Sequence, residues 1–189
     1  MNTSTTTLPY RIGEPDGQCR YPVIVGENQV IGHAYRWHRD WLTVTSAGET
    51  NLRRPAVGQR GVDMAAAAII EDYAAGRITA VPLAEATATQ ASPDGRVPLL
   101  DPRMPATARN AESARKALAG LAAHSWTPFT GFPGSDNPWF LHCELCGWEG
   151  PRYWSHLRGR NGNPPSASRH PGGCIGEAEV RRVIAAYQA

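Results

Sequence analysis

The sequence predicts an α+β protein of two small modules joined by a proline-rich linker. Three observations point to this class: short β-like runs followed by a helical pattern, a later stretch rich in proline, and a group of cysteine and histidine residues near the end of the chain. Small modules with thin cores are commonly stabilised by a metal ion or a disulfide. The expected boundaries are a disordered leader at 1–19, a β-meander with one helix at 20–78, the linker at 79–106 and a treble-clef zinc module with flanking helices at 107–189.

The first module follows a polar leader that offers little apolar surface to bury. Three runs, YPVIV, QVIGHAYRW and DWLTVTS, are rich in β-branched and aromatic residues, and the breaks between them, GEN and HR, are short enough for hairpins. The stretch SAGETNLRRP then predicts a turn and a short fourth strand. GVDMAAAAIIEDYAAG has apolar residues at helical spacing and ends on Gly76, which predicts a helix over 61–76.

Two further helices are expected in the second module. NAESARKALAGLAAHSW begins with Asn110, a residue type that favours the N-cap position. The final segment, GEAEVRRVIAAYQA, is amphipathic and places Val180, Val183, Ile184 and Tyr187 on one face.

The spacing Cys143-x2-Cys146 followed by His170-x3-Cys174 predicts a metal site. Gly147 allows the tight turn that such a knuckle needs. Three thiolates and one imidazole suit a tetrahedral zinc ion and fill all four positions, so the zinc is expected to be structural, with no activated water. His142 and His156 are alternatives to His170 as the fourth ligand. Cys19 is expected to be a free thiol near the first strand.

The order of knuckle, hairpin and ligand-bearing helix is the treble-clef arrangement, with WEGPRYWSHLRG as the expected hairpin and Cys174 opening the last helix. The segment from about Gly120 to Ile175 resembles a small treble-clef zinc module of GC-rich Gram-positive bacteria and their mobile elements. The residues that carry the resemblance are Pro133, Gly134, Pro138, Trp139, Cys143, Cys146, Gly147, Pro151, Arg152, Tyr153, Gly159 and Cys174. The family usually ends in a closely spaced cysteine pair, whereas this chain has His170 and Cys174 after a longer loop. The resemblance implies a nucleic-acid-associated role, and no family is identified for the first module.

The function expected first is that of a zinc-stabilised adaptor that binds DNA or RNA. The stretch from Gly150 to Gly173 has four arginines and no carboxylate, and aromatic residues lie among them. Arginine forks bind phosphates and exposed aromatic rings stack on unpaired bases. The expected contact residues are Arg152, Tyr153, Trp154, His156, Arg158, Arg160 and Arg169. A competing interpretation is that the arginines are solvated or balance the charge of the zinc thiolates.

Two other classes of function remain open. One is a phage- or plasmid-type interaction module that binds a host protein through exposed tryptophans, with Trp37 and Trp41 flanking a hairpin tip. The other, a minor alternative, is a metal-dependent nuclease with His156 as base and Asn161 or Asn163 nearby. No catalytic residue is assigned, and an enzyme is not the expected class.

Composition limits the remaining possibilities. The net charge of +2 gives the whole chain no strong field for polyanions. The polar N-terminus does not have the pattern of a secretion signal, and no stretch approaches the roughly 18 apolar residues of a membrane span. The expected location is therefore the cytoplasm, where close cysteines favour metal binding over disulfides. No membrane partner and no small-molecule cofactor are expected.

Overall fold

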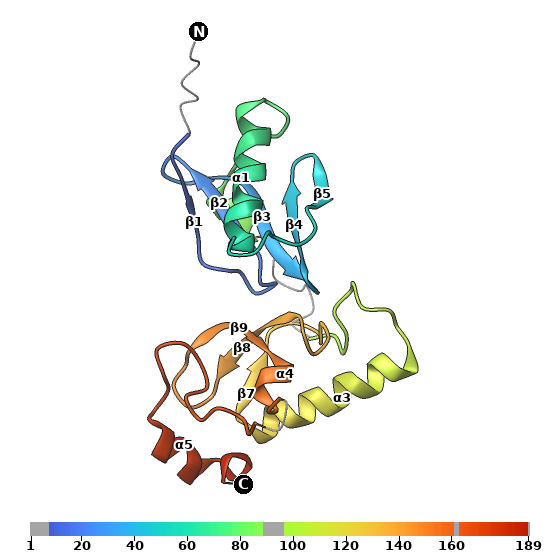
Figure 1. Cartoon of the computed structure of the whole chain (residues 1–189), viewed down its shortest axis with the longest axis vertical. Helices are drawn as coiled ribbons and strands as arrows, with labels where there is room; N and C mark the ends of the chain where they lie inside the picture. Colours follow the sequence, from blue (N-terminus) through green and yellow to red (C-terminus); the bar gives the residue numbers. More distant parts are fainter. Residues whose placement is uncertain (1–7, 89–96, 161–162, 189) are drawn as a thin grey trace. The chain divides into compact units, whose positions relative to one another are not determined.

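The computed structural model describes residues 8–88, 97–160 and 163–188, which form two compact units (Figure 1). Apart from Gly17–Cys19, the first unit comprises the described residues up to Ala88 and the second comprises those from Val97 onward. Each unit combines an antiparallel sheet with helices, so the α+β class is confirmed.

The first unit contains a five-strand meander in the order β1-β2-β3-β4-β5. Its strands are β1 (Tyr10–Ile12), β2 (Tyr21–Val25), β3 (Gln29–Trp37), β4 (Asp40–Thr45) and β5 (Gly48–Asn51), and β6 (Val81–Pro82) pairs with β3. The predicted breaks GEN and HR are the turns on either side of β3, and the predicted fourth strand is β5. The meander is therefore confirmed.

Helix α1 (Gly61–Ala74) packs on the sheet and ends just before Gly76, as predicted. Its buried alanine and isoleucine side chains contact the apolar side chains of β2 and β3, among them Val23 and Ile31. Trp41 packs closely on the start of the helix, where a Cβ at Gly61 would lie 1.8 Å from the indole Nε1. Trp41 is thus half-buried and packs against the core of the first unit.

The structure differs from the expected boundaries in two places. Strand β1 lies inside the segment expected as a leader, because Tyr10 to Ile12 pair with β2 at the edge of the sheet. Strand β6 and the short helix α2 (Leu83–Ala88) lie inside the segment expected as a linker. The leader residues 1–7 and the linker residues 89–96 lie outside the described residues.

The second unit contains a three-strand sheet in the order β7-β8-β9. Its elements are α3 (Ala108–Ala123), β7 (Trp126–Pro128), β8 (Pro138–Cys143), β9 (Glu149–Tyr153), α4 (Trp154–Leu157), α5 (Glu177–Val183) and the 3-10 helix η1 (Ala185–Tyr187). Helix α3 begins earlier than predicted, because the hydroxyl of Thr107 accepts from the N–H of Asn110 and acts as the cap. Among the described residues, no helix combines the length and apolar character needed to cross a membrane.

Two apolar clusters form the core of the second unit. The larger packs Ala117 and Leu121 of α3 against buried side chains of the sheet and α4, including Trp139 and Trp154. The smaller is formed by Ala167, Val180, Ile184 and Tyr187. Leu145 and Cys174 are partly buried against both clusters, so the ligand-bearing loops join the two layers.

The last helix is shorter than predicted. It ends at Val183, and the chain continues as η1, so Val183 is 43% exposed while Val180, Ile184 and Tyr187 are buried. The expectation that Val183 shares the buried face is wrong. Cys174 lies three residues before the helix starts at Glu177 and does not open it.

Candidate metal centre

Cys143 and Cys146 lie at the tip of the β8–β9 hairpin. Cys143 is the last residue of β8, and its carbonyl oxygen accepts from the N–H groups of Cys146 and Gly147, at 3.3 and 2.9 Å. Gly147 has a φ of +75°, a left-handed conformation that glycine adopts without strain. The N–H of Cys143 then donates to the carbonyl of Trp148, which returns the chain into β9. The knuckle turn is therefore built as the spacing predicts.

This turn corrects the expected position of the hairpin. The prediction put a hairpin after the knuckle, within 148–159. In the structure the knuckle connects the two strands of the hairpin, because Glu149 pairs with His142. The chain then enters α4 at Trp154.

His170 and Cys174 come from the loop before α5, and they meet the knuckle. The ligand atoms of Cys143, Cys146, His170 and Cys174 all lie within 4.8 Å of one another. The Sγ atoms of Cys143 and Cys174 are 3.7 Å apart, and Cys146 Sγ lies 3.1 Å from His170 Nε2. A tetrahedral zinc ion with Zn–S bonds of about 2.3 Å separates two sulfurs by about 3.8 Å. The donor set and its spacing therefore fit zinc.

The orientation of the His170 ring also fits a ligand. Nδ1 lies 3.1 Å from the carbonyl oxygen of Pro171, so this nitrogen carries the proton and donates. The lone pair is then on Nε2, the atom that faces Cys146. Trp148 stacks on the ring at 4.7 Å with an angle of 2°, which fixes the plane of the imidazole. Hydrogen bonding and stacking around a metal-binding histidine orient it in this way.

Arg169, next to the ligand His170, is buried beside the cluster and is 1% exposed. Its guanidinium donates to the carbonyls of His124 and Ser125, at 2.6 and 2.9 Å, and to Cys143 Sγ at 3.3 Å. It also lies over the Trp126 ring, 4.4 Å from the centroid. Among the described residues, no carboxylate forms an ion pair with Arg169, and the sulfur of Cys143 is the group in its surroundings that can become an anion.

The thiols of Cys143 and Cys174, the first and last ligands of the cluster in the sequence, differ in acidity. Burial raises the pKa of Cys143, but hydrogen bonds from the Leu145 N–H and the Arg169 guanidinium outweigh this effect and bring the pKa below its usual value. Burial raises the pKa of Cys174 to about 11. Of these two thiols, Cys143 is therefore the one that its environment favours as a thiolate, which is the form that binds metal.

The two competing histidines lie outside the cluster. His142 Nδ1 lies 3.2 Å from Glu149 Oε1, across the hairpin. His156 is exposed on α4, where its Nε2 lies 3.4 Å from Arg160 Nη1. The structure thus brings His170, and neither alternative, to the three cysteines. Cys19 is buried just before β2 and, among the described residues, forms no disulfide, as predicted.

The residues expected to contact nucleic acid fall into two groups. His156, Arg158 and Arg160 are exposed, and Arg152 and Tyr153 are half-buried. Trp154 and Arg169 are buried, at 8% and 1% exposure, so neither side chain is open to a nucleic acid in this structure. Trp154 fills the core against α3. Arg169 faces the cysteine cluster and donates to Cys143 Sγ, the position that the charge-balancing interpretation requires.

The residues named for the other two classes of function are placed as follows. Three of the six tryptophans are buried and three are half-buried, and Trp37 and Trp41, expected at the hairpin tip, are among the half-buried ones. Among the described residues, the Cys3His cluster is the only convergent group of three or more His, Cys, Asp or Glu side chains. No second metal set accompanies His156 there, Asn163 pairs through its backbone with Arg160, and Asn161 lies outside the described residues.

Sequence reasoning missed the stacking of Trp148 on His170, and it did not single out Arg169 among the arginines weighed as balancing charge. Trp148 and Arg169 directly adjoin the ligand segments in the sequence, and this adjacency was the available signal.

The fold and the site together define an α+β protein with a Cys3His cluster at the tip of a β-hairpin. No family model, no curated protein and no solved structure matches the chain.

Proposed function

We propose that the Cys3His cluster binds one structural zinc ion and that the second unit is a treble-clef variant. The observation that carries this is the convergence of four ligand atoms from two segments on one point. The first ligand pair lies in a knuckle and the second lies just before α5, as in a treble clef. The hairpin between the pairs is reduced to the isolated bridge between Arg160 and Asn163. All four zinc positions are taken by protein ligands, so the ion stabilises the fold and does not activate water.

We further propose that the zinc-bound unit binds DNA or RNA as an adaptor. The supporting feature is a surface formed by Tyr153, His156, Arg158 and Arg160, hereafter the β9–α4 surface. The Tyr153 and His156 rings are 5.2 Å apart, and Arg160 reaches His156. Among the described residues, the Arg158 guanidinium makes no ion pair or hydrogen bond. One acidic group, Asp136, lies 3.8 Å from Arg160.

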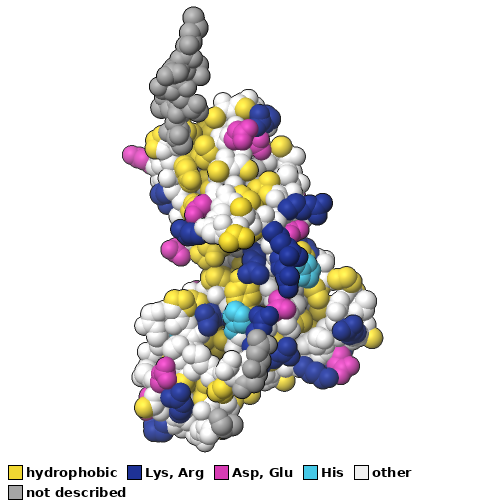
Figure 2. All heavy atoms as spheres, viewed as in Figure 1, with side chains coloured by type: hydrophobic (Ala, Val, Ile, Leu, Met, Phe, Trp, Pro, Cys, Tyr) yellow, Lys and Arg dark blue, Asp and Glu magenta, His cyan; other side chains and the backbone are white. Residues whose placement is uncertain are grey.

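This surface has the chemistry of a strand-binding patch. Guanidinium forks hold phosphates in a bidentate way, and neighbouring rings give a base a stacking partner. Arg152 adds positive charge from β9. Its side chain is half-buried, and this burial lowers the pKa of the guanidinium. Figure 2 shows that Lys and Arg side chains gather in groups on the face in view. The metal's part is to hold the loop that carries these side chains.

The test is binding of zinc-loaded protein to single-stranded RNA, single-stranded DNA and duplex DNA at about 50 and 200 mM salt. We expect salt-sensitive binding that Arg158→Gln with Arg160→Gln weakens, with the slope of log affinity against log salt reduced by about 1 per arginine. The matched control is Arg181→Gln with Arg182→Gln on α5, which removes the same charge from residues paired with Glu177 and Glu179. Equal loss in both double variants, or no binding to any nucleic acid, would refute the proposal.

The host-protein alternative makes the opposite prediction in a pulldown. An adaptor that binds nucleic acid loses its associated proteins on nuclease treatment. A partner that stays bound after nuclease treatment, and whose binding ignores the Arg158 and Arg160 substitutions, would favour the protein-interaction function.

A further inference from the structure

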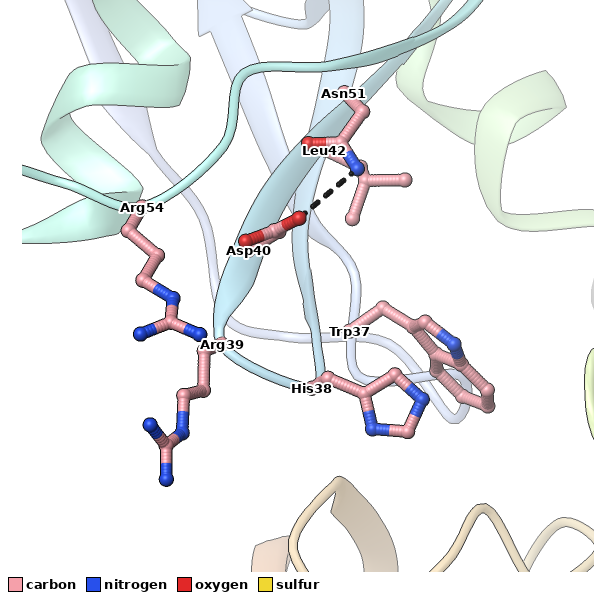
Figure 3. Close-up of a pocket in the computed structure, with 7 residues that line it drawn as sticks. All are labelled: Trp37, His38, Arg39, Asp40, Leu42, Asn51 and Arg54. Atoms are coloured by element: carbon pink, nitrogen blue, oxygen red, sulfur yellow. Dashed lines mark hydrogen bonds between the residues drawn. The ribbon is translucent and has the colours of Figure 1, made fainter.

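A surface pocket of about 400 Å³ lies at the β3–β4 turn of the first unit, in a part of the chain with no assigned role. Two arginines, Arg39 and Arg54, line it together with Asp40 and the rings of Trp37 and His38. Figure 3 shows the two arginine side chains on one side of Asp40 and the two rings on the other. The pocket thus has a cationic wall and an aromatic wall.

The turn residues are fixed by hydrogen bonds. His38 has a φ of +54°, and its carbonyl accepts from Arg36 Nε at 2.9 Å. This contact holds the tip that presents Trp37, His38 and Arg39.

Asn51 fixes the opposite side of the pocket. Its Nδ2 donates to Asp40 Oδ2 at 3.2 Å, and its Oδ1 accepts from the N–H of Arg53 at 2.7 Å. Arg53 has a φ of +65°, which turns the chain and directs the following residue, Arg54, to the pocket. One side chain thus positions both the carboxylate and the second arginine.

The two guanidinium groups remain available. Arg39 and Arg54 are both exposed, and among the described residues neither side chain makes an ion pair or a hydrogen bond. Asp40 is the one acidic residue in the lining, and Asn51 holds one of its oxygens. Two arginines against one carboxylate leave a net positive charge, which attracts an anion.

We propose that this pocket binds a nucleoside phosphate. Arg39 and Arg54 hold the phosphate as paired forks, and the base packs against the Trp37 and His38 rings, whose centroids are 5.4 Å apart. The second oxygen of Asp40 accepts a hydrogen bond from an amino or hydroxyl group of the nucleoside. A volume of about 400 Å³ falls within the roughly 300–1,000 Å³ of small-molecule sites. The ligand is either a free nucleotide or one nucleotide of a strand, and the inference stands apart from the β9–α4 surface.

The experiment compares a complete nucleotide with its nucleoside, which lacks the phosphate, and with inorganic phosphate, which lacks the nucleoside. Full-length zinc-loaded protein is titrated calorimetrically with adenosine monophosphate, adenosine and inorganic phosphate. Binding to a labelled single strand of about 10 nucleotides is followed by fluorescence anisotropy. The test variant is Arg39→Gln with Arg54→Gln. The matched control, Arg11→Gln with Arg77→Gln, removes the same charge from the same unit at residues outside the pocket.

We expect adenosine monophosphate to bind more tightly than either adenosine or phosphate. The Arg39→Gln, Arg54→Gln variant should bind adenosine monophosphate at least about tenfold more weakly, because the charge-assisted hydrogen bonds to the phosphate are lost. The control variant should bind it with unchanged affinity. Trp37→Leu should weaken adenosine monophosphate and leave phosphate unchanged. If the pocket variant also weakens the strand, the ligand is strand-borne, and if it leaves the strand unaffected, the ligand is the free nucleotide.

Three results would overturn the inference: equal binding by pocket variant and control, phosphate binding as tight as that of the nucleotide, or no nucleotide binding in either form. The Arg158→Gln, Arg160→Gln variant is measured in the same series. If the single strand binds through Arg158 and Arg160 alone and no free nucleotide binds, the pocket is excluded as a nucleotide site. The proposed function of the β9–α4 surface would then still stand.

Discussion

The guanidinium of Arg169 donates to the sulfur of Cys143 at 3.3 Å, with the arginine almost completely buried. Three thiolates, one neutral imidazole and a divalent ion have a net charge of about −1. In the proposed zinc site, the buried arginine would cancel that charge. A buried cation without a partner is costly, so we expect the arginine and the metal-bound thiolates to depend on each other.

Replacing Arg169 by Met should therefore affect both metal binding and stability. We expect zinc affinity to fall about 10–100-fold, as for other residues that support metal ligands. The free energy of unfolding should fall by about 3 kcal/mol, because the charge partner and the hydrogen bonds to His124 and Ser125 are lost. Competition with a chelator and thermal unfolding measure the two effects.

Two further variants separate charge from packing. Arg169→Lys keeps the charge but not the fork, so it should retain more zinc affinity than Arg169→Met. Arg158→Met makes the same change at an exposed position and should leave zinc binding unchanged. If Arg169→Met bound zinc like the wild type, the charge-balancing role would be excluded.

The identity of the metal ligands can be tested by replacing a cysteine of the cluster and each of the three candidate histidines in turn. His170→Ala and Cys146→Ser should each lose stoichiometric zinc, with unfolding of the second unit, because metal-binding energy is folding energy in such sites. His142→Ala and His156→Ala serve as matched controls and should each keep one zinc ion per chain. Metal analysis after gel filtration, with circular dichroism, gives the answer. Zinc loss in His156→Ala with retention in His170→Ala would reassign the fourth ligand.

Gly120 on α3 should not tolerate alanine. A Cβ there would lie 2.1 Å from the ring of Trp154, which is confined by the core. Alanine normally stabilises a helix interior, but here we expect a loss of about 1–3 kcal/mol, the cost of overpacking. Denaturant unfolding of zinc-loaded protein measures it.

The cause can be checked by relieving the clash. Trp154→Phe combined with Gly120→Ala should lose less stability than the sum of the two single changes. A strictly additive pair would show that the helix, and not the ring contact, is responsible.

His33 on β3 should make the first unit less stable in mild acid. Burial, aided by the positive charge of Arg20 and opposed by Asp16, lowers its pKa below the usual value of about 6.5. As the pH falls below about 6.5, His33 is protonated more fully in the unfolded chain than in the folded one. The free energy of unfolding therefore decreases, and it stops decreasing once the pH is below the pKa of His33 in the folded state.

His33→Gln removes this loss. Hydrogen exchange of β2–β4 amides, corrected for intrinsic rates, should show less destabilisation between pH 7 and 5 in the variant. His38→Gln, at the exposed turn, should behave like the wild type. An unchanged pH dependence in His33→Gln would show that another group is responsible.

The local patterns predicted much of the fold. The two turns around β3, the helix at Gly61–Ala74 and the four cluster residues lie where residue type and spacing place them. These features depend on neighbours close in sequence, such as Gly147 in the knuckle.

The remaining features depend on contacts between distant residues. The strand at Tyr10–Ile12 forms because β2 offers an unpaired edge, although the leader around it is polar. The burial of Arg169 and Trp154 depends on partners such as Ser125 and Gly120, which lie tens of residues away in the chain. An arginine in an acid-free stretch therefore has the same sequence pattern whether it faces solvent or a cluster of thiolates.

Leu145 and Cys174 pack against both apolar clusters of the second unit, and each lies on a ligand-bearing loop. Neither cluster is large, and the ligand segments span the boundary between them. The number of residues that unfold together should therefore depend on the supply of zinc. At high zinc the two layers should melt as one cooperative block, stabilised by RT ln(1 + [Zn]/Kd). As the free zinc concentration falls, the C-terminal cluster around Val180 should unfold before the larger cluster. The cooperativity of the unfolding transition should therefore depend on the free zinc concentration.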